Sequence, residues 1–236
     1  MSSKDIASAK TCGIVLFPDM TQLDATAPYE VLCRIPGMNV LLLAIDPSPV
    51  PTEHGMRITP DCSLSNSPAL DIVLIPGGAG VTETLIDKRY VDFVAGSAAH
   101  TQWIVSVCTG ALLLGAAGLL QGYRATTHWL SLQFLPAFGA IPVSDERVVV
   151  DRNRITGAGV SAGLDLALLL ASKLSGEEVA QAIQLGIEYD PAPPFHSGHP
   201  RTSPDKIRLM EEMRLKQAIE RRKEVVNIAS ALLVSP

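Results

Sequence analysis

The chain has 236 residues, of which 47% are hydrophobic and 18% charged, and its formal net charge is −5. This composition is typical of a soluble globular protein with a large core, and the negative charge argues against nucleic acid as the main partner. The polar N-terminus does not resemble a secretion signal, and the longest apolar stretch, 110–120, is too short to cross a bilayer. We therefore expect a cytoplasmic protein that binds neither nucleic acid nor a membrane.

Short apolar runs alternate with helical patterns in the first half of the chain. The predicted strands are 13–17, 40–45, 71–75 and 103–107, and the predicted helices are 23–35, 91–99 and 109–117. The strands are apolar throughout, which is typical of a parallel sheet covered on both faces. Strand and helix in alternation predict an α/β, doubly wound fold with a mostly parallel sheet and helices on both faces.

The second half of the chain predicts a hairpin followed by two helices. The hairpin strands are 147–150 and 154–156, and the glycine-containing turn 157–159 leads into an apolar helix at 160–174. Residues 175–178 have the form of a capping box, which predicts that another helix starts there.

A last helix is expected over 203–234, because Ser203-Pro204 suits its N-cap and first position. Its charges, including Arg-Arg-Lys at 221–223, are interpreted as a solvated face. We expect one domain over 1–236 with a polar N-terminal extension at 1–11.

Cys108 lies where an apolar strand turns into a helix, in the motif SVCTG. Sites in open α/β sheets form at such carboxyl ends of strands. A thiol at a helix N-terminus also lies near the positive end of the helix dipole, which predicts a lowered pKa and a nucleophilic thiolate. The other three cysteines, Cys12, Cys33 and Cys62, lack this context. Because the chain has no CxxC pair, all four cysteines are expected to be free thiols.

Three further features are candidates for the same site. The N–H groups of Gly77 and Gly78, after a predicted strand, can face a ligand and stabilise developing negative charge. Asp24 either caps a helix or carries protons for a cysteine. His128 is a possible base and a possible border of the site, although we prefer the interpretation of a core histidine.

Other polar residues are weaker candidates. Gly159 is expected to border the site, since it follows a predicted strand and permits close packing or movement. Asp165, inside an apolar helix, is expected to make a structural hydrogen bond. His196 and His199 lie in a proline-rich loop with no acid nearby, so we expect no metal site.

Several motifs together resemble one known superfamily. They are LD at 23–24, IPGG at 75–78, SVCTG at 106–110, GAAGLLQG at 115–122 and ATTHW at 125–129. Over about residues 13–195 the chain resembles the ThiJ/PfpI superfamily, the class I glutamine-amidotransferase-like group. More narrowly, Asp24, the Cys-Thr-Gly turn and the segment at 188–195 resemble the isocyanide hydratases of that superfamily.

The resemblance implies a flavodoxin-like fold, a homodimer and no metal or organic cofactor. It also implies the addition of water to an isocyanide, which gives an N-substituted formamide. Cys108 would attack the terminal carbon, Asp24 would supply and recover protons, and a thioimidate would be hydrolysed. The amides of Gly77 and Gly78 would line the pocket, and Thr109 would position the groups around the sulfur.

The superfamily is functionally mixed, so other activities are weighed beside this one. Its peptidases carry histidine where this chain has Thr109, which argues against a Cys-His protease. Its glyoxalases and deglycases usually carry glutamate in place of Asp24. Ligand-binding domains of AraC-type regulators share the TTHW segment, but they continue into a helix-turn-helix region, whereas one helix is expected here. Redox sensing by Cys108 without turnover stays open.

Overall fold

The computed structural model describes residues 10–234. In this part of the chain, a seven-stranded sheet has the order β10-β11-β7-β6-β1-β2-β5, and only β10 runs antiparallel to its neighbour. Its strands are β1 (Lys10–Val15), β2 (Met38–Ala44), β5 (Cys62–Ser63), β6 (Ile72–Ile75), β7 (Trp103–Val107), β10 (Val148–Asp151) and β11 (Arg154–Gly157). The predicted α/β fold with a mainly parallel sheet is confirmed.

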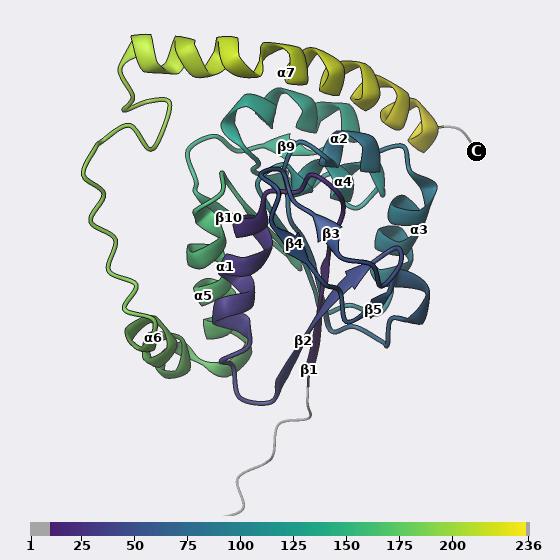
Figure 1. Cartoon of the computed structure of the whole chain (residues 1–236), viewed down its shortest axis with the longest axis vertical. Coiled ribbons are helices and arrows are strands. Elements are labelled where there is room, and N and C mark those ends of the chain that lie inside the picture. Colours follow the sequence, from purple (N-terminus) through teal and green to yellow (C-terminus); the bar gives the residue numbers. More distant parts are fainter. Residues whose placement is uncertain (1–9, 235–236) are drawn as a thin grey trace, which may run out of the picture.

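Helices cover both faces of this sheet (Figure 1). The helices α1 and α5 pack against each other on one face, and α3 and α4 pack together on the other. The helices are α1 (Gln22–Leu32), α2 (Val81–Thr84), α3 (Lys88–Ser97), α4 (Gly110–Ala116), α5 (Ala162–Ser175), α6 (Glu177–Gly186) and α7 (Asp205–Val234). Two 3-10 helices and two short strand pairs complete the described elements: η1 (Leu64–Asn66), η2 (Trp129–Phe138), β3 (Val50–Pro51) with β4 (Arg57–Ile58), and β8 (Arg124–Ala125) with β9 (Ile141–Pro142).

The core lies on the central strands, whose buried residues are almost all apolar. Ile14 of β1, Leu74 of β6 and Ile104 of β7 are fully buried, as expected for strands covered on both faces. Because β1, β6, β7 and β11 are parallel, their carboxyl ends meet at one edge of the sheet. This edge is where the candidate site residues gather.

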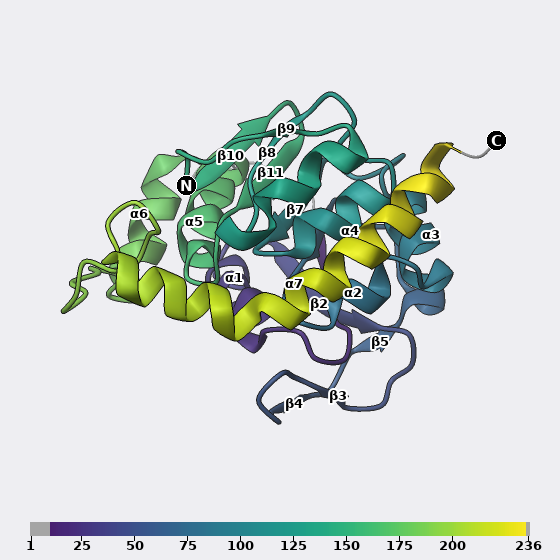
Figure 2. The ribbon, with the colours of Figure 1, turned by 90° about the horizontal axis from the view of Figure 1, so that it is seen from above.

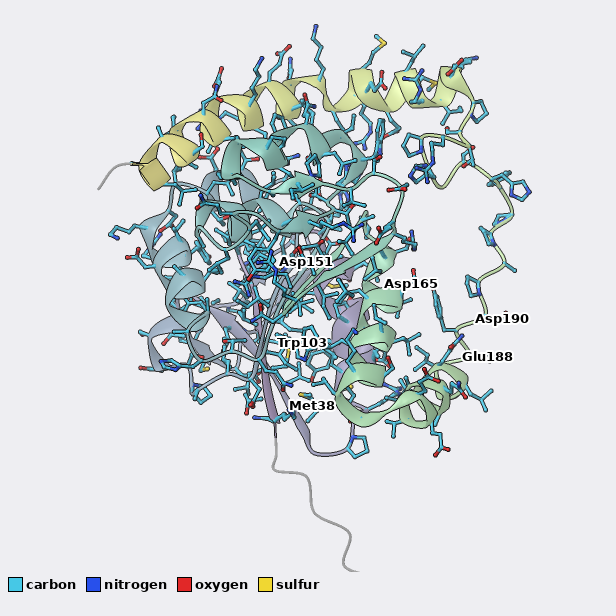
Figure 3. The ribbon with its side chains drawn as sticks, turned by 180° about the vertical axis from the view of Figure 1, so that it is seen from behind. Met38, Trp103, Asp151, Asp165, Glu188 and Asp190 are labelled. Atoms are coloured by element: carbon cyan, nitrogen blue, oxygen red, sulfur yellow. The ribbon has the colours of Figure 1, made fainter. Side chains whose placement is uncertain are left out.

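The helix α7 lies across that same edge, at the top of Figure 1 and crossing the molecule in Figure 2. It packs against η2, α2 and α4, and buries Val225, Val226 and Ala229. The segment 187–204 connects it to α6 without helix or strand. This linker is attached to the body near its start, where the Tyr189 hydroxyl donates to Asp165 Oδ1 at 2.8 Å (Figure 3 labels Asp165 and the neighbouring Glu188 and Asp190). Among the described helices, none is long and apolar enough to span a membrane.

Some local expectations were wrong. The helix expected to start within 175–178 does start there, at Glu177, but the capping box itself does not form, because Ser175 is the last residue of α5 and Gly176, with φ 90°, is the N-cap of α6. The helix α3 starts at Lys88, ahead of the predicted 91, because the Asp87 carboxylate caps it by accepting from the Arg89 amide. Of the polar extension expected at 1–11, residues 1–9 lie outside the described residues, and Lys10 with Thr11 already belongs to β1.

Candidate active site

Cys108 occupies a strained turn between β7 and α4. Its φ is 54°, in the left-handed region that a side chain rarely adopts. Its amide donates to the carbonyls of Ala158 at 2.9 Å and Gly157 at 3.1 Å, and the Thr127 hydroxyl donates to its carbonyl at 2.7 Å. Groups from two other segments therefore hold the cysteine in this conformation, as is common where strain serves a function.

Gly110 lets the turn lie against β6. A Cβ at this position would come within 2.2 Å of the Ile75 carbonyl oxygen. No side chain fits there without a shift of backbone, so the glycine is required by the close approach of two segments. This packing places the start of α4 beside the residues that follow β6.

Asp24 is completely buried in the first turn of α1. Its Oδ2 accepts from the Gly77 amide at 2.9 Å. Its Oδ1 is buried without an N–H or O–H donor, and the Cys108 thiol is the neighbouring group that interacts with this carboxyl. The carboxylate thus contacts the turn after β6 and the cysteine, which excludes the helix-capping alternative.

Burial raises the pKa of Asp24 to about 7, against the lowering effects of the Gly77 amide and the Cys108 thiol. A carboxyl of this kind exchanges protons readily near neutral pH, which suits a general acid or base.

The pKa of Cys108 moves opposite to the sequence-based expectation. Burial raises it well above the ordinary value, and the charge of Asp24 raises it further. The Thr109 amide and the charge of Arg222 lower it, but they do not outweigh the burial. The helix α4 has only seven residues, and its dipole acts on a thiol that is 5% exposed. The resting thiol therefore keeps its proton, and Asp24 is the group placed to accept it.

The backbone amides of Gly77 and Gly78 contribute to the site by holding the side chains of Asp24 and Thr109. The Gly77 amide donates to Asp24, and the Gly78 amide donates to Thr109 Oγ1 at 2.9 Å, whose hydroxyl donates back to the Gly78 carbonyl. We expected both amides to face a ligand directly, and the structure instead uses them to fix Asp24 and Thr109. Gly78 has to be glycine, because its φ is 130° and a Cβ there would lie only 2.3 Å from the Thr21 nitrogen.

A pocket of about 250 Å³ opens onto Cys108 and Thr109. Its apolar walls come from Leu130, Val160, Leu215, Ala218 and Ile219. Its charged or titratable lining residues are Glu53, His54, His128, Arg214 and Arg222. Because α7 contributes five of these side chains, the last helix forms one wall of the candidate site.

His128 is half-buried and lines this pocket as well as an adjoining pocket of about 480 Å³. Our preferred interpretation as a core histidine was therefore wrong. Burial, together with the charges of Arg222 and Arg214, lowers the pKa of His128 to about 4, so its imidazole is neutral at neutral pH. Gly159 lines the adjoining pocket, and a Cβ there would lie 3.4 Å from His128 Cδ2, so this glycine borders His128.

Arg222 was wrongly assigned to a solvated face, since its side chain is 6% exposed. The signal was present in the sequence: Ile219, Arg222, Val226 and Ala229 recur at helical spacing, which places the arginine on the apolar face of α7. Asp165 makes the structural contacts that were expected, since it accepts hydrogen bonds from Arg147 and Tyr189.

All four cysteines are free, as expected. Within residues 10–234 no group of three His, Cys, Asp or Glu side chains is arranged to hold a metal ion.

Comparison with known proteins identifies the family of this chain and its relatives. The family model described as the DJ-1/PfpI family matches residues 10–173. The chain belongs to the DJ-1/PfpI family. It is 46% identical over 221 residues to the isonitrile hydratase of Pseudomonas putida, an alignment that covers 94% of this chain and 96% of the relative. The crystal structure of a THiJ/PfpI family protein from Pseudomonas syringae superposes with a TM-score of 0.90 at 36% identity, covering 94% of this chain and 92% of that one.

One relative of this chain is a regulator. The HTH-type transcriptional regulator GbdR of Pseudomonas aeruginosa is 31% identical over an alignment that covers 74% of this chain and 49% of the regulator. Family membership alone therefore fixes the fold and leaves the activity to be argued from the site.

Proposed function

We propose that this protein is an enzyme, a hydro-lyase that adds water to an isocyanide, R–NC, and releases an N-substituted formamide. The observation that carries the proposal is the buried pair of the Cys108 thiol and the Asp24 carboxyl, whose pKa of about 7 suits proton exchange. The similarity to an isonitrile hydratase along nearly the whole of both chains supports the same substrate class.

In the first half of the reaction, the thiol adds to the terminal carbon of the isocyanide. The Cys108 sulfur forms a bond to that carbon while its proton passes to the Asp24 carboxylate. Asp24 then delivers a proton to the same carbon, which gives the thioimidate R–N=CH–S–Cys. A covalent intermediate of this kind divides one difficult addition into two easier steps.

In the second half, water adds to the thioimidate carbon, and a proton reaches the nitrogen by way of Asp24. The C–S bond then breaks, the sulfur recovers a proton from the new hydroxyl group, and R–NH–CHO leaves. Overall, R–NC and H₂O give R–NH–CHO, with no oxidant, reductant or metal among the reactants. Thr109, fixed by Gly78, helps to position the groups around the sulfur.

The apolar part of the pocket lining suits the R group of a small isocyanide. Leu130, Val160 and Ile219 line the space beside Cys108, and the volume of about 250 Å³ suits a small molecule better than a peptide. An isocyanide is linear, weakly polar and electrophilic at one carbon, so its R group can lie against these apolar side chains while that carbon meets the sulfur.

The test is formamide production from a simple aryl isocyanide in the presence of a chelator. The wild type should turn over, Cys108→Ser should not, and the exposed-cysteine control Cys33→Ser should match the wild type. Intact mass spectrometry of the wild type during turnover should show an adduct, and a digest of the quenched protein should place it on the peptide that contains Cys108. Efficient conversion of methylglyoxal to lactate, with isocyanides left untouched, would show that the glyoxalase alternative is correct.

A further inference from the structure

Arg222 is a buried cation without a carboxylate partner. Its Nε donates to Thr82 Oγ1 at 3.2 Å and its Nη1 donates to Ser131 Oγ at 3.0 Å, and both acceptors are buried neutral hydroxyls. Among residues 10–234 no carboxylate forms an ion pair with this guanidinium, whereas the neighbouring Arg221 pairs with Glu83 and Glu224. Buried charges are normally paired, so an anion beside Arg222 would stabilise its buried guanidinium. In the resting protein no carboxylate of the described residues takes that place.

The pocket contains one group that becomes an anion during the proposed reaction. Cys108 and Arg222 line the same pocket, and the thiol loses its proton when Asp24 accepts it. Burial lowers the pKa of Arg222, and the charges of Cys108 and Glu53 oppose that effect. Glu53 is the competing anion, but it is exposed and accepts from the Thr21 hydroxyl at 2.9 Å.

The other titratable groups around the sulfur come from four segments. They are Asp24 of α1, Glu53 and His54 between β3 and β4, His128 before η2, and Arg214 of α7. Asp24 and Glu53 are acidic, His128 is neutral, and Arg214 and Arg222 are the two arginines that line the pocket. Arg214 is 64% exposed and pairs with Glu211, which leaves Arg222 as the buried cation of the site.

We propose that Arg222 is a positioning residue of this site: it is the cation beside which the Cys108 sulfur becomes a thiolate. Thr82 of α2 and Ser131 of η2 hold its guanidinium in place. Because Arg222 belongs to α7, the packing of this helix against the body brings both a positive charge and one wall of the pocket to Cys108. The role in turnover rests on the proposed function, but the effect on the thiol can be measured without an isocyanide.

The experiment measures the rate of alkylation of Cys108 by iodoacetamide against pH, with peptide mass spectrometry to separate the four cysteines. The midpoint of the profile and the limiting rate at high pH are fitted separately, so a change in access does not mimic a change in ionisation. Arg222→Met removes the charge and keeps much of the apolar stem, and Arg222→Lys keeps the charge. Arg221→Met is the matched control, since it removes an exposed charge one position away.

We expect Arg222→Met to raise the midpoint by about one pH unit, which slows alkylation about tenfold at pH values below it. Arg222→Lys should lie near the wild type, and Arg221→Met should match it. An unchanged midpoint in Arg222→Met, or an equal shift in Arg222→Lys, would overturn the proposal.

If Arg222→Met does not fold, the double variant Thr82→Val with Ser131→Ala provides the test. It leaves the charge present but removes both acceptors, so the midpoint should rise, and an unchanged midpoint would again overturn the proposal. A wild type that fails to hydrate isocyanides yet shows these shifts would contradict only the proposed function.

Discussion

At the scale of single residues, Asp24 stands out because burial brings the pKa of its carboxyl close to neutral pH. It must be a carboxylate to accept the thiol proton, and its pKa is about 7. We therefore predict that kcat/KM for an aryl isocyanide rises with pH through about 7 and then levels. Asp24→Asn should lose turnover, and Asp24→Glu should recover little, because the longer side chain displaces the carboxyl from Gly77 and Cys108. A fully active Asp24→Asn variant would exclude the proton-carrier role.

The same pKa has a consequence for stability. An ordinary aspartate titrates near pH 3.9, so between about pH 4 and pH 7 the folded protein binds more protons at Asp24 than the unfolded chain does. The free energy of unfolding contributed by this group is therefore fully present below about pH 4 and is lost as the pH rises through about 7.

Asparagine does not titrate, so Asp24→Asn should gain stability relative to the wild type as the pH rises. The gain between about pH 4.5 and about pH 8 should be on the order of 3 kcal/mol. Urea unfolding of both proteins at these two pH values measures it. A stability difference that stays constant with pH would mean that Asp24 is not buried as a titrating group.

Gly110 tests the close approach at the nucleophile turn. Because a Cβ there would meet the Ile75 carbonyl at 2.2 Å, Gly110→Ala should destabilise the protein by about 1–3 kcal/mol or prevent folding. The control is Gly96→Ala in α3, where a Cβ meets nothing within 4 Å. Alanine there should raise the free energy of unfolding by roughly 0.5–1 kcal/mol. Thermal unfolding compares the two, and equal effects would show that the turn is not closely packed.

At the scale of elements, the linker at 187–204 joins two well-packed parts of the molecule. Much of it is exposed and without helix or strand, while α7 buries Val225, Val226 and Ala229 against the body. Exposed irregular segments are the usual sites of limited proteolysis. A protease of broad specificity should therefore cut first within 190–203.

Apolar packing should keep α7 in place after that cut. The nicked protein should elute as one species under native conditions, retain its turnover and separate into two fragments only in urea. First cleavage inside α7, or loss of the helix from the nicked protein, would contradict the docking of α7 that the structure shows.

At the scale of the whole molecule, several large apolar side chains face solvent in the described part of the chain. Leu185, Phe195 and Met213 are 81%, 77% and 76% exposed. We predict a homodimer on the strength of the family resemblance, and side chains of this kind are candidates for its interface. Light scattering after size exclusion should give twice the 25.1 kDa of the single chain. A mass of one chain at micromolar concentration would exclude a stable dimer.

The sequence by itself determined the features that depend on local pattern. Apolar runs predicted β1, β6 and β7, because a strand buried on both faces has no polar alternation. The position of Cys108 at a strand-to-helix turn was also readable, since the turn residues and the helix follow it directly. These signals lie within a few neighbouring residues, so no knowledge of distant contacts was needed.

Only the tertiary structure decided the chemistry of the site, because its contacts join residues far apart in the chain. Asp24 meets Gly77 across 53 positions, Gly78 meets Thr109 across 31, and Arg222 meets Thr82 across 140. The use of the glycine amides and the hydroxyl partners of Arg222 follow from such long-range contacts, although the place of Arg222 on the apolar face of α7 was readable from the sequence. The local helix-dipole argument predicted a lowered thiol pKa, and it was wrong because the desolvation of a group depends on everything that encloses it.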